Sequence, residues 1–471
     1  MTAHCSCRYM VWEKDFRKWT EERYATIFFR YIFANMISSI GVSVYILIDT
    51  FFISKGMGAD GLAALNLSLP VFSFLNGFGL MLGMGGGSIF SMLYCRTERR
   101  ETDKVFTNAF MAMLLIAALF ETAGIFLSGQ ITRLLGADEH VFALSHDYLR
   151  TILLFSPAFL LNNLIVCFLR NDCAPKLAML GTLCGSLANV VLDYVFIFPL
   201  GMGMKGAALA TCIAPFVSLS IMSIHFLTGW NAFRLRLMLP SWSMLKEIVS
   251  LGLHAFFTEV SGGLVIFAFN SVIHRLMGNA GIAAYGVIAN IAIVFTALFI
   301  GLSSGVQPLM CRYHGRRDEK AIKYLLRLSL ITSVIAAIFS YVLLFVHTAP
   351  VVRAFNSSGD VSMREIAENG LRIYFLYMPF MGVNAIMSVY FSSEEKPHIA
   401  QMISLLRGTL LVIPAVFAAY LLRSIGLVWL AVPISELLTV ITAWCIYFFI
   451  RRKSTVSAGL PKPARRLSAD M

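Results

Sequence analysis

Long apolar stretches recur along the whole chain and are separated by short polar segments. A stretch of about twenty apolar residues crosses the hydrocarbon core of a bilayer as one helix. The pattern predicts twelve such helices, near residues 31–53, 62–90, 105–128, 147–169, 178–199, 206–228, 250–274, 282–310, 322–346, 369–391, 398–420 and 426–450. We therefore expect an all-α polytopic membrane protein with twelve transmembrane helices.

Basic residues gather in every second predicted loop. The loop after the second helix contains Arg96, Arg99, Arg100 and Lys104, whereas the loop after the first contains Lys55 alone. Because lysine and arginine mark the cytoplasmic side of a membrane protein, the even loops and both termini are predicted to be cytoplasmic. These clusters also account for the net charge of +12, so nucleic acid is not expected as a partner.

The chain resembles itself when it is shifted by about 220 residues. Residues 57–64 match residues 277–284, and Asn162 matches Asn384. Each half holds six predicted helices, an even number, so both halves enter the membrane in the same orientation. The sequence predicts two pseudo-symmetric six-helix lobes around a central cavity. The predicted division is a cytoplasmic N-terminal segment (1–30), an N-lobe (31–228), a cytoplasmic lobe linker (229–249), a C-lobe (250–450) and a cytoplasmic tail (451–471).

Composition restricts the class of protein further. Hydrophobic residues make up 58% of the 471 positions and charged residues 14%, against about a quarter charged residues in a soluble domain. The nine cysteines show no metal-ligand spacing, so no metal centre is predicted. The Gly-Lys-Ser/Thr spacing of a phosphate-binding loop is absent, so ATP is not expected as the energy source, and no cofactor is predicted.

Two acidic residues lie within predicted membrane helices, each with a polar residue four positions before it. Tyr45 and Asp49 share one face of the first helix, and Asn189 and Asp193 share one face of the fifth. An ionised side chain at the centre of a bilayer costs about 2.5–3.5 kcal/mol, so such residues usually serve a function. We expect all four side chains to converge on one internal site.

Polar groups from neighbouring helices complete this predicted site, namely Asn162 or Asn163 of the fourth helix and Thr211 of the sixth. Neighbouring carboxylates favour a proton on one of them, and neutral groups satisfy either charge state. The site therefore suits a coupling cation. Two alternatives place the acids in water instead: Asp193 lies near the outer end of its helix, and Asp49 could reach outwards to the interface.

The second half contains a buried acid of its own. Glu259 lies about nine residues into the seventh predicted helix, where the cost of burying a charge indicates a function. We expect it to form a second cation site or to balance the charge of a cationic substrate. Glu121 and Glu436 also lie within predicted helices, and their roles stay open.

Several sequence strings resemble one family of transporters, namely Ile48–Ile53, Gly61–Leu65, Leu169–Lys176, Asn189–Phe198 and Gly203–Thr211. From about residue 30 to residue 450 the chain is similar to the multidrug and toxic compound extrusion (MATE) transporters, most of all to the bacterial branch of MepA-type exporters. This resemblance implies a twelve-helix, two-lobed antiporter. Such a protein expels organic cations against an inward flow of protons or sodium ions.

The resemblance also implies roles for individual residues. Asp49 matches the first-helix acid that takes the coupling ion. The residues that match the surrounding network are Tyr45, Asn189, Asp193 and Thr211, with Tyr148 as a further candidate. Glu259 matches a seventh-helix acid that helps some members to bind a coupling cation. Those members also have an aspartate in the tenth helix, which residues 378–390 lack, so proton coupling through the first half is favoured.

The resulting prediction is a secondary active efflux antiporter that works by alternating access. We expect it to exchange cationic or amphiphilic drugs for protons or sodium ions, as a multi-pass monomer in the bacterial inner membrane. One alternative is a lipid-linked precursor flippase of the same superfamily, which requires a cationic cavity for phosphate. Another is an intramembrane enzyme that uses Asp49 and Asp193 as an acid pair, although catalysis needs no duplicated halves.

Overall fold

The computed structural model describes residues 21–94, 99–236, 238–355 and 361–458. Within these ranges every regular element is helical, which confirms the all-α prediction. The predicted terminal segments 1–30 and 451–471 lie mostly outside the described residues. The elements of the first half are α2 (Glu21–Leu93), α3 (Arg99–Phe126), α4 (Ser128–Leu134), α5 (Glu139–Leu154), α6 (Ser156–Asn171), α7 (Pro175–Ile197), α8 (Gly203–Met222) and α9 (Ile224–Leu227).

The second half begins with another long helix. Its elements are α10 (Trp242–Gly315), α11 (Glu319–Val346), α12 (Thr348–Phe355), α13 (Val361–Tyr374), the 3-10 turn η1 (Phe375–Tyr377), α14 (Met378–Ser393), α15 (Pro397–Leu405), the π-helical turn η2 (Leu406–Leu410), α16 (Val412–Leu421) and α17 (Ile425–Ala458). Among the described residues, eleven helices are long and apolar enough to span a membrane. A twelfth span results if α5 and α6, which meet at 53°, count as one.

The fourth predicted helix is this bent pair. Phe155 separates α5 from α6, and Pro157 occupies the first turn of α6, where a proline removes no helical hydrogen bond. In the second half the corresponding Pro379 also lies in a first turn, that of α14. There, however, the residues from Val361 to Ser393 form one continuous span through η1. Of these two equivalent prolines, only Pro157 thus lies at a sharp bend.

Backbone angles confirm the internal repeat. Both α2 and α10 consist of two membrane-length helices that meet at a glycine, Gly58 (φ 66°, ψ −151°) in one and Gly278 (φ 63°, ψ −149°) in the other. Only glycine adopts these angles readily, because it has no Cβ. Positive φ also recurs after the fourth and tenth spans, at Cys173 (63°) and Glu395 (57°).

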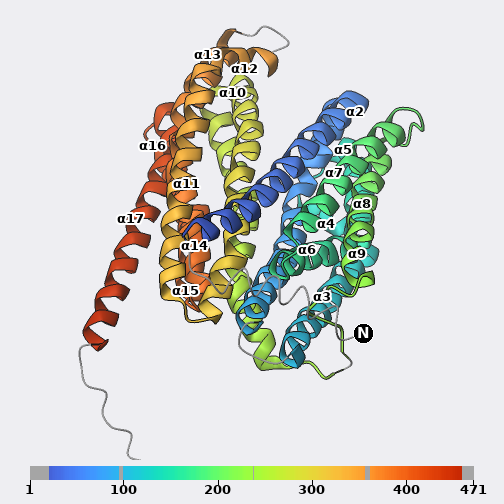
Figure 1. Cartoon of the computed structure of the whole chain (residues 1–471). Coiled ribbons are helices and arrows are strands. Elements are labelled where there is room, and N and C mark those ends of the chain that lie inside the picture. The colour runs from blue at the N-terminus through green and yellow to red at the C-terminus, as the bar shows by residue number, and fades with distance from the viewer. Residues whose placement is uncertain (1–20, 95–98, 237, 356–360, 459–471) are drawn as a thin grey trace, which may run out of the picture.

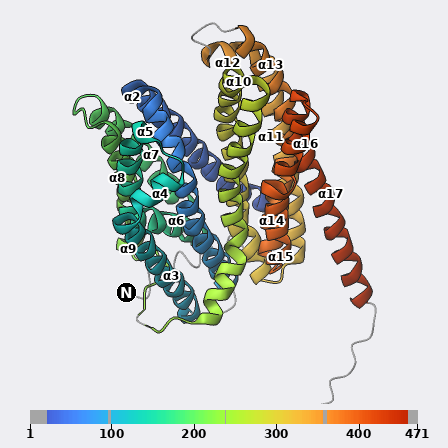
Figure 2. The same cartoon turned by 180° about the vertical axis from the view of Figure 1, so that it is seen from behind.

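The two halves form two helical bundles (Figures 1 and 2). Separate hydrophobic clusters fill them, one built mainly from α2 to α8 and one from α10 to α17. A third cluster joins the halves, because Tyr24, Phe28 and Tyr31 at the start of α2 pack with Val306 and Met310 of α10. The first helix therefore begins against the second lobe and crosses to the first.

The lobes meet near one end of the molecule, which we call the basic end and define by the segments 172–174, 228–236, 316–318 and 394–396. Here α2 and α10 approach so closely that a Cβ on Gly85 would overlap the Ile248 carbonyl. A Cβ on Gly252 would likewise overlap the Met81 carbonyl. Towards the other end, which carries α12, the two bundles diverge (Figure 1).

Polar contacts reinforce this junction. The Gln307 amide of α10 donates to Ser88 Oγ at 2.6 Å and to the Met84 carbonyl at 3.1 Å on α2. Arg312, near the end of α10, donates to the Asn171 carbonyl at 2.9 Å and to Cys173 Sγ at 2.7 Å. Buried donors that find partners across the junction make its closed form specific.

Gly252→Val should destabilise the protein because the added side chain separates α10 from α2. Overpacking of this kind costs about 1–3 kcal/mol, and here the obstacle is backbone, which cannot rotate away. The matched control is Gly262→Val on the same helix, where nothing lies within 4 Å of the added Cβ. Thermal unfolding of the detergent-purified proteins should show a lower melting temperature for Gly252→Val alone. Equal melting temperatures would contradict the tight contact.

Candidate functional site

Asp49 of α2 and Asp193 of α7 face each other inside the first lobe. Their carboxyl groups lie within hydrogen-bonding reach, so a proton on one can be shared with the other. Asp49 is 7% exposed and Asp193 is fully buried, which removes the alternatives that place either acid in bulk water. One oxygen of each carboxyl receives no hydrogen bond from an N–H or O–H donor among the described residues.

Aromatic packing explains why the two helices present their acids to each other. One turn beyond Asp49, the Phe52 ring packs edge-on against Phe198 at 5.9 Å between centroids and tilted against Tyr194 at 6.1 Å. Pairs of this geometry add about 0.5–1.5 kcal/mol to the free energy gained by burying the rings. The cluster fixes the rotation of both helices and so directs Asp49 and Asp193 towards the same space.

Neutral polar groups surround the pair. In the amide orientation that satisfies both of its atoms, Asn189 donates to Asp193 Oδ2 at 3.0 Å and accepts from the Thr211 N–H at 3.2 Å. The Tyr148 hydroxyl of α5 lies within hydrogen-bonding reach of the Thr211 hydroxyl. Helices α5, α7 and α8 thus bring Tyr148, Asn189 and Thr211 together beside the acids.

Tyr45 and Glu259 connect this cluster to the second lobe. The Tyr45 hydroxyl on α2 lies within electrostatic range of Asp49, Asp193 and Glu259. Glu259 belongs to α10, the helix that closes the basic end against α2. An acidic residue from each lobe therefore lies within electrostatic range of the Tyr45 hydroxyl.

The two asparagines of α6 differ in their contacts. Asn163 donates to Asn76 Oδ1 of α2 at 3.0 Å and packs against Gly79. The side-chain amide oxygen of Asn162 (Oδ1) is buried and has no hydrogen-bond partner among the described residues. Neither amide makes a described hydrogen bond with Asp49, Asp193 or Thr211.

A second buried network, which the sequence did not reveal, lies in the second lobe. Glu436 Oε1 of α17 accepts from Arg407 at 3.0 Å and 3.1 Å. Its other oxygen accepts from Asn384 of α14 at 2.6 Å. The side chains of the ion pair are only 10% and 5% exposed. The available sequence signal was an arginine and a glutamate within apolar helices, each of which requires a partner there.

Loop contacts hold the basic end together at the ends of the membrane spans. Asp172 accepts from the Ala232 N–H at 2.8 Å and lies 2.8 Å from His225 Nε2. Burial raises the pKa of the Asp172 carboxyl, and the contacts with His225 and Ala232 oppose that rise in part. On the linker side, Asp103 of α3 receives the Arg236 side chain at 2.6 Å and the Arg234 N–H at 2.8 Å.

Comparison with known proteins identifies the family. The MatE family model matches residues 35–195 and 255–418, one segment in each lobe. The chain belongs to the MatE family. The Multidrug export protein MepA of Staphylococcus saprophyticus is 26% identical over 424 residues, which cover 89% of this chain and 93% of that protein. This membership confirms the predicted resemblance and identifies a transporter rather than an enzyme.

Solved structures agree with this fold. One, described as the outward-facing conformation of a multidrug resistance MATE family transporter of the MOP superfamily, aligns with a TM-score of 0.85. It is 21% identical, and the alignment covers 91% of this chain and 96% of that chain. Another, the MATE multidrug transporter DinF-BH, aligns with a TM-score of 0.83 at 25% identity, covering 90% of this chain and 96% of that chain. Both likenesses confirm the two-lobed twelve-helix architecture.

Proposed function

We propose that this protein exports organic cations and other amphiphilic drugs from bacterial cells in exchange for protons, with sodium ions as the alternative coupling ion. The observation that carries the proposal is the buried pair Asp49 and Asp193, whose carboxyl groups lie within reach of each other. The name of the staphylococcal relative, a multidrug export protein, supports the substrate class. Both termini and the basic end are assigned to the cytoplasm.

Alternating access follows from the lobe arrangement. In the described conformation the glycine contacts and the Gln307 and Arg312 hydrogen bonds close the basic end. Substrate enters when these contacts open. It is released on the other side when a proton from outside binds to the Asp49 and Asp193 pair, lowers its negative charge by one and so weakens the attraction for a cation. One charge moving across 100 mV supplies about 2.3 kcal/mol, so strong accumulation needs a pH gradient as well or more than one ion.

Charge argues against the flippase alternative. A flippase for a lipid-linked precursor has to stabilise phosphate, which favours lysine or arginine at the binding site. The described site instead combines Asp49, Asp193 and Glu259 with neutral partners. Arg407, which lies within a membrane span, is already paired with Glu436. These charges support a cationic cargo.

Transport by the purified wild-type protein tests the proposal. We expect proteoliposomes to move ethidium against its gradient when a proton gradient is imposed, and to stop when an ionophore collapses that gradient. A sodium gradient of equal size should support less transport, because the second half has no tenth-helix aspartate between residues 378 and 390. Transport driven by sodium alone would overturn proton coupling. Transport under neither gradient would overturn the exporter and favour the flippase.

A further inference from the structure

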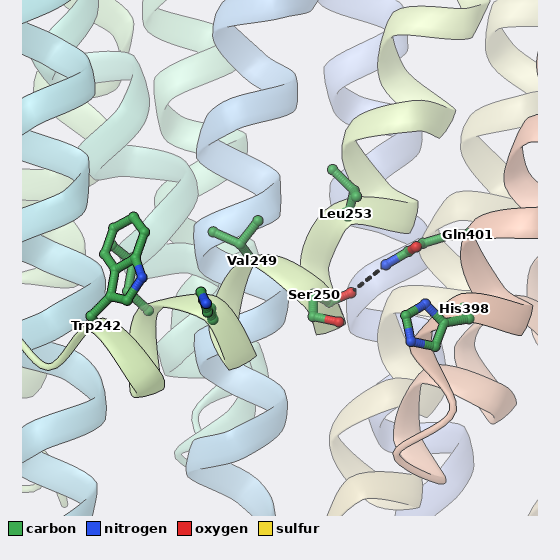
Figure 3. A pocket seen from close by; sticks show the side chains of 8 residues that line it. Trp242, Val249, Ser250, Leu253, His398 and Gln401 are labelled. Atoms are coloured by element: carbon green, nitrogen blue, oxygen red, sulfur yellow. Dashed lines mark hydrogen bonds between the residues drawn. The ribbon is translucent and has the colours of Figure 1, made fainter.

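A groove at the basic end lies outside the proposed transport site. Its cavity has a volume of about 460 Å³, and its lining comes from the start of α10 and the start of α15. Figure 3 shows Trp242 at one end and Gln401 at the other, where the Gln401 amide donates to the Ser250 carbonyl at 2.9 Å. The volume falls within the range of small-molecule sites, about 300–1,000 Å³.

The α10 face of this groove is apolar along most of its length. The lining residues of α10 recur at helical spacing on one side, namely Trp242, Leu245, Lys246, Val249 and Leu253. Another side of the same turns carries Ile248 and Gly252, which contact α2 at the lobe junction. An occupant of the groove would therefore pack on the turns that close the basic end.

One lysine and one histidine line the groove. Lys246 of α10 and His398 of α15 both line it, and no carboxylate among the described residues lies within ion-pair distance of either. Three acids lie near the start of α15, and one of them, Glu247 of α10, is within electrostatic range of Glu395. Glu394 lies 3.5 Å from His314 and 3.7 Å from Lys396, and Glu395 lies 3.4 Å from His314.

The surroundings are those of a membrane interface. Trp242 is 69% exposed, and Lys246 Nζ lies 6.0 Å from the centre of its ring. Exposed tryptophan together with basic residues is typical of the headgroup region of a membrane protein. Basic residues there attract anionic lipids by about 1 kcal/mol each.

We propose that this groove binds one anionic phospholipid. Its phosphate lies between Lys246 and His398, and an acyl chain packs along Leu245, Val249 and Leu253. The bound lipid bridges α10 and α15 next to the contact of α10 with α2. The same charges disfavour a cationic drug in the groove, which distinguishes this site from the transport site.

Native mass spectrometry of the full-length protein in detergent tests the proposal with phosphatidylglycerol and phosphatidylcholine as probes. We expect one phosphatidylglycerol to bind about tenfold more tightly than phosphatidylcholine. The variant Lys246→Gln/His398→Gln should lose that preference. Its matched control is Lys176→Gln/Lys320→Gln, which removes two exposed charges at the same end of the molecule and should keep it. In this control, Lys176 follows Pro175 as His398 follows Pro397.

A second variant distinguishes binding within the groove from binding to a charged surface. Leu253→Trp fills the apolar part of the groove and leaves both basic side chains in place, so it should also weaken phosphatidylglycerol binding. Unchanged binding by Leu253→Trp, equal binding of both lipids, or wild-type binding by Lys246→Gln/His398→Gln would each overturn the proposal. Displacement of the lipid by ethidium would do so too, because it would assign the groove to substrate. Circular dichroism of each variant checks that the helices are intact.

Discussion

Asp49→Asn should reduce proton-driven export to the level of empty vesicles. The asparagine has nearly the shape of the aspartate but cannot take up a proton, and it leaves Asp193 without a carboxyl partner in a buried site. Proton binding at residue 49 would then no longer change the charge that faces the substrate, and Asp193 would have no second carboxyl with which to share a proton. Initial rates of ethidium efflux under an imposed pH gradient measure the effect directly.

A matched control comes from another membrane acid. Glu121 lies in α3, is partly exposed, and has no described contact with Asp49 or Asp193, so Glu121→Gln should export at the wild-type rate. The double variant Asp49→Asn/Asp193→Asn should be no worse than Asp49→Asn, because residues that act as a unit are not additive. Undiminished proton-driven export by Asp49→Asn would rule out the pair as the coupling site and direct attention to Glu259.

The spans and the duplication could be predicted from sequence because each depends on a local or periodic signal, whereas the pairing of α2 with α7 was a hypothesis suggested by their polar residues. Apolar length gives the spans, a constant offset gives the repeat, and four-residue spacing puts Tyr45 with Asp49 on one face. A proline within a span makes a kink possible at Pro157 and at Pro379 alike, so the sequence could not show which half would bend. Pro157 and Pro379 occupy equivalent first-turn positions, and the difference lies in tertiary packing, which overrides local preference.

The composition of the site shows the same limit. The sequence places Asn162 and Asn163 on the fourth span. It does not show towards which neighbouring helices each side chain points once that span bends. Asn163 is turned to Asn76 of α2 instead. The partner of Glu436 could not be predicted from spacing either, because Arg407 is 29 residues away on another helix. Only the cost of two buried charges indicates that these residues should meet.

Breaking the Arg407 and Glu436 pair should have the largest effect on stability. Arg407 lies in the π-helical turn η2, where the Leu411 N–H donates to the Leu406 carbonyl at 3.1 Å instead of the usual α-helical partner. The helix is wider at this turn, and here the Arg407 guanidinium points towards Glu436. Arg407→Met leaves the carboxylate buried without its counter-charge, which costs about 3–5 kcal/mol. The melting temperature in detergent should fall accordingly, whereas Arg327→Met, at an exposed position of α11, should leave it unchanged.

The double variant Arg407→Met/Glu436→Gln distinguishes charge compensation from simple loss of contacts. Neither charge remains, and the glutamine oxygen still accepts the hydrogen bond from Asn384 that Glu436 Oε2 accepts at 2.6 Å. Most of the lost stability should therefore return, because a buried ion pair adds little beyond cancelling its own desolvation. If the double variant is as unstable as Arg407→Met, packing rather than charge explains the loss. If it is stable and still exports ethidium, Glu436 neutralises Arg407 and takes no part in ion coupling, which leaves the acids around Tyr45 to perform it.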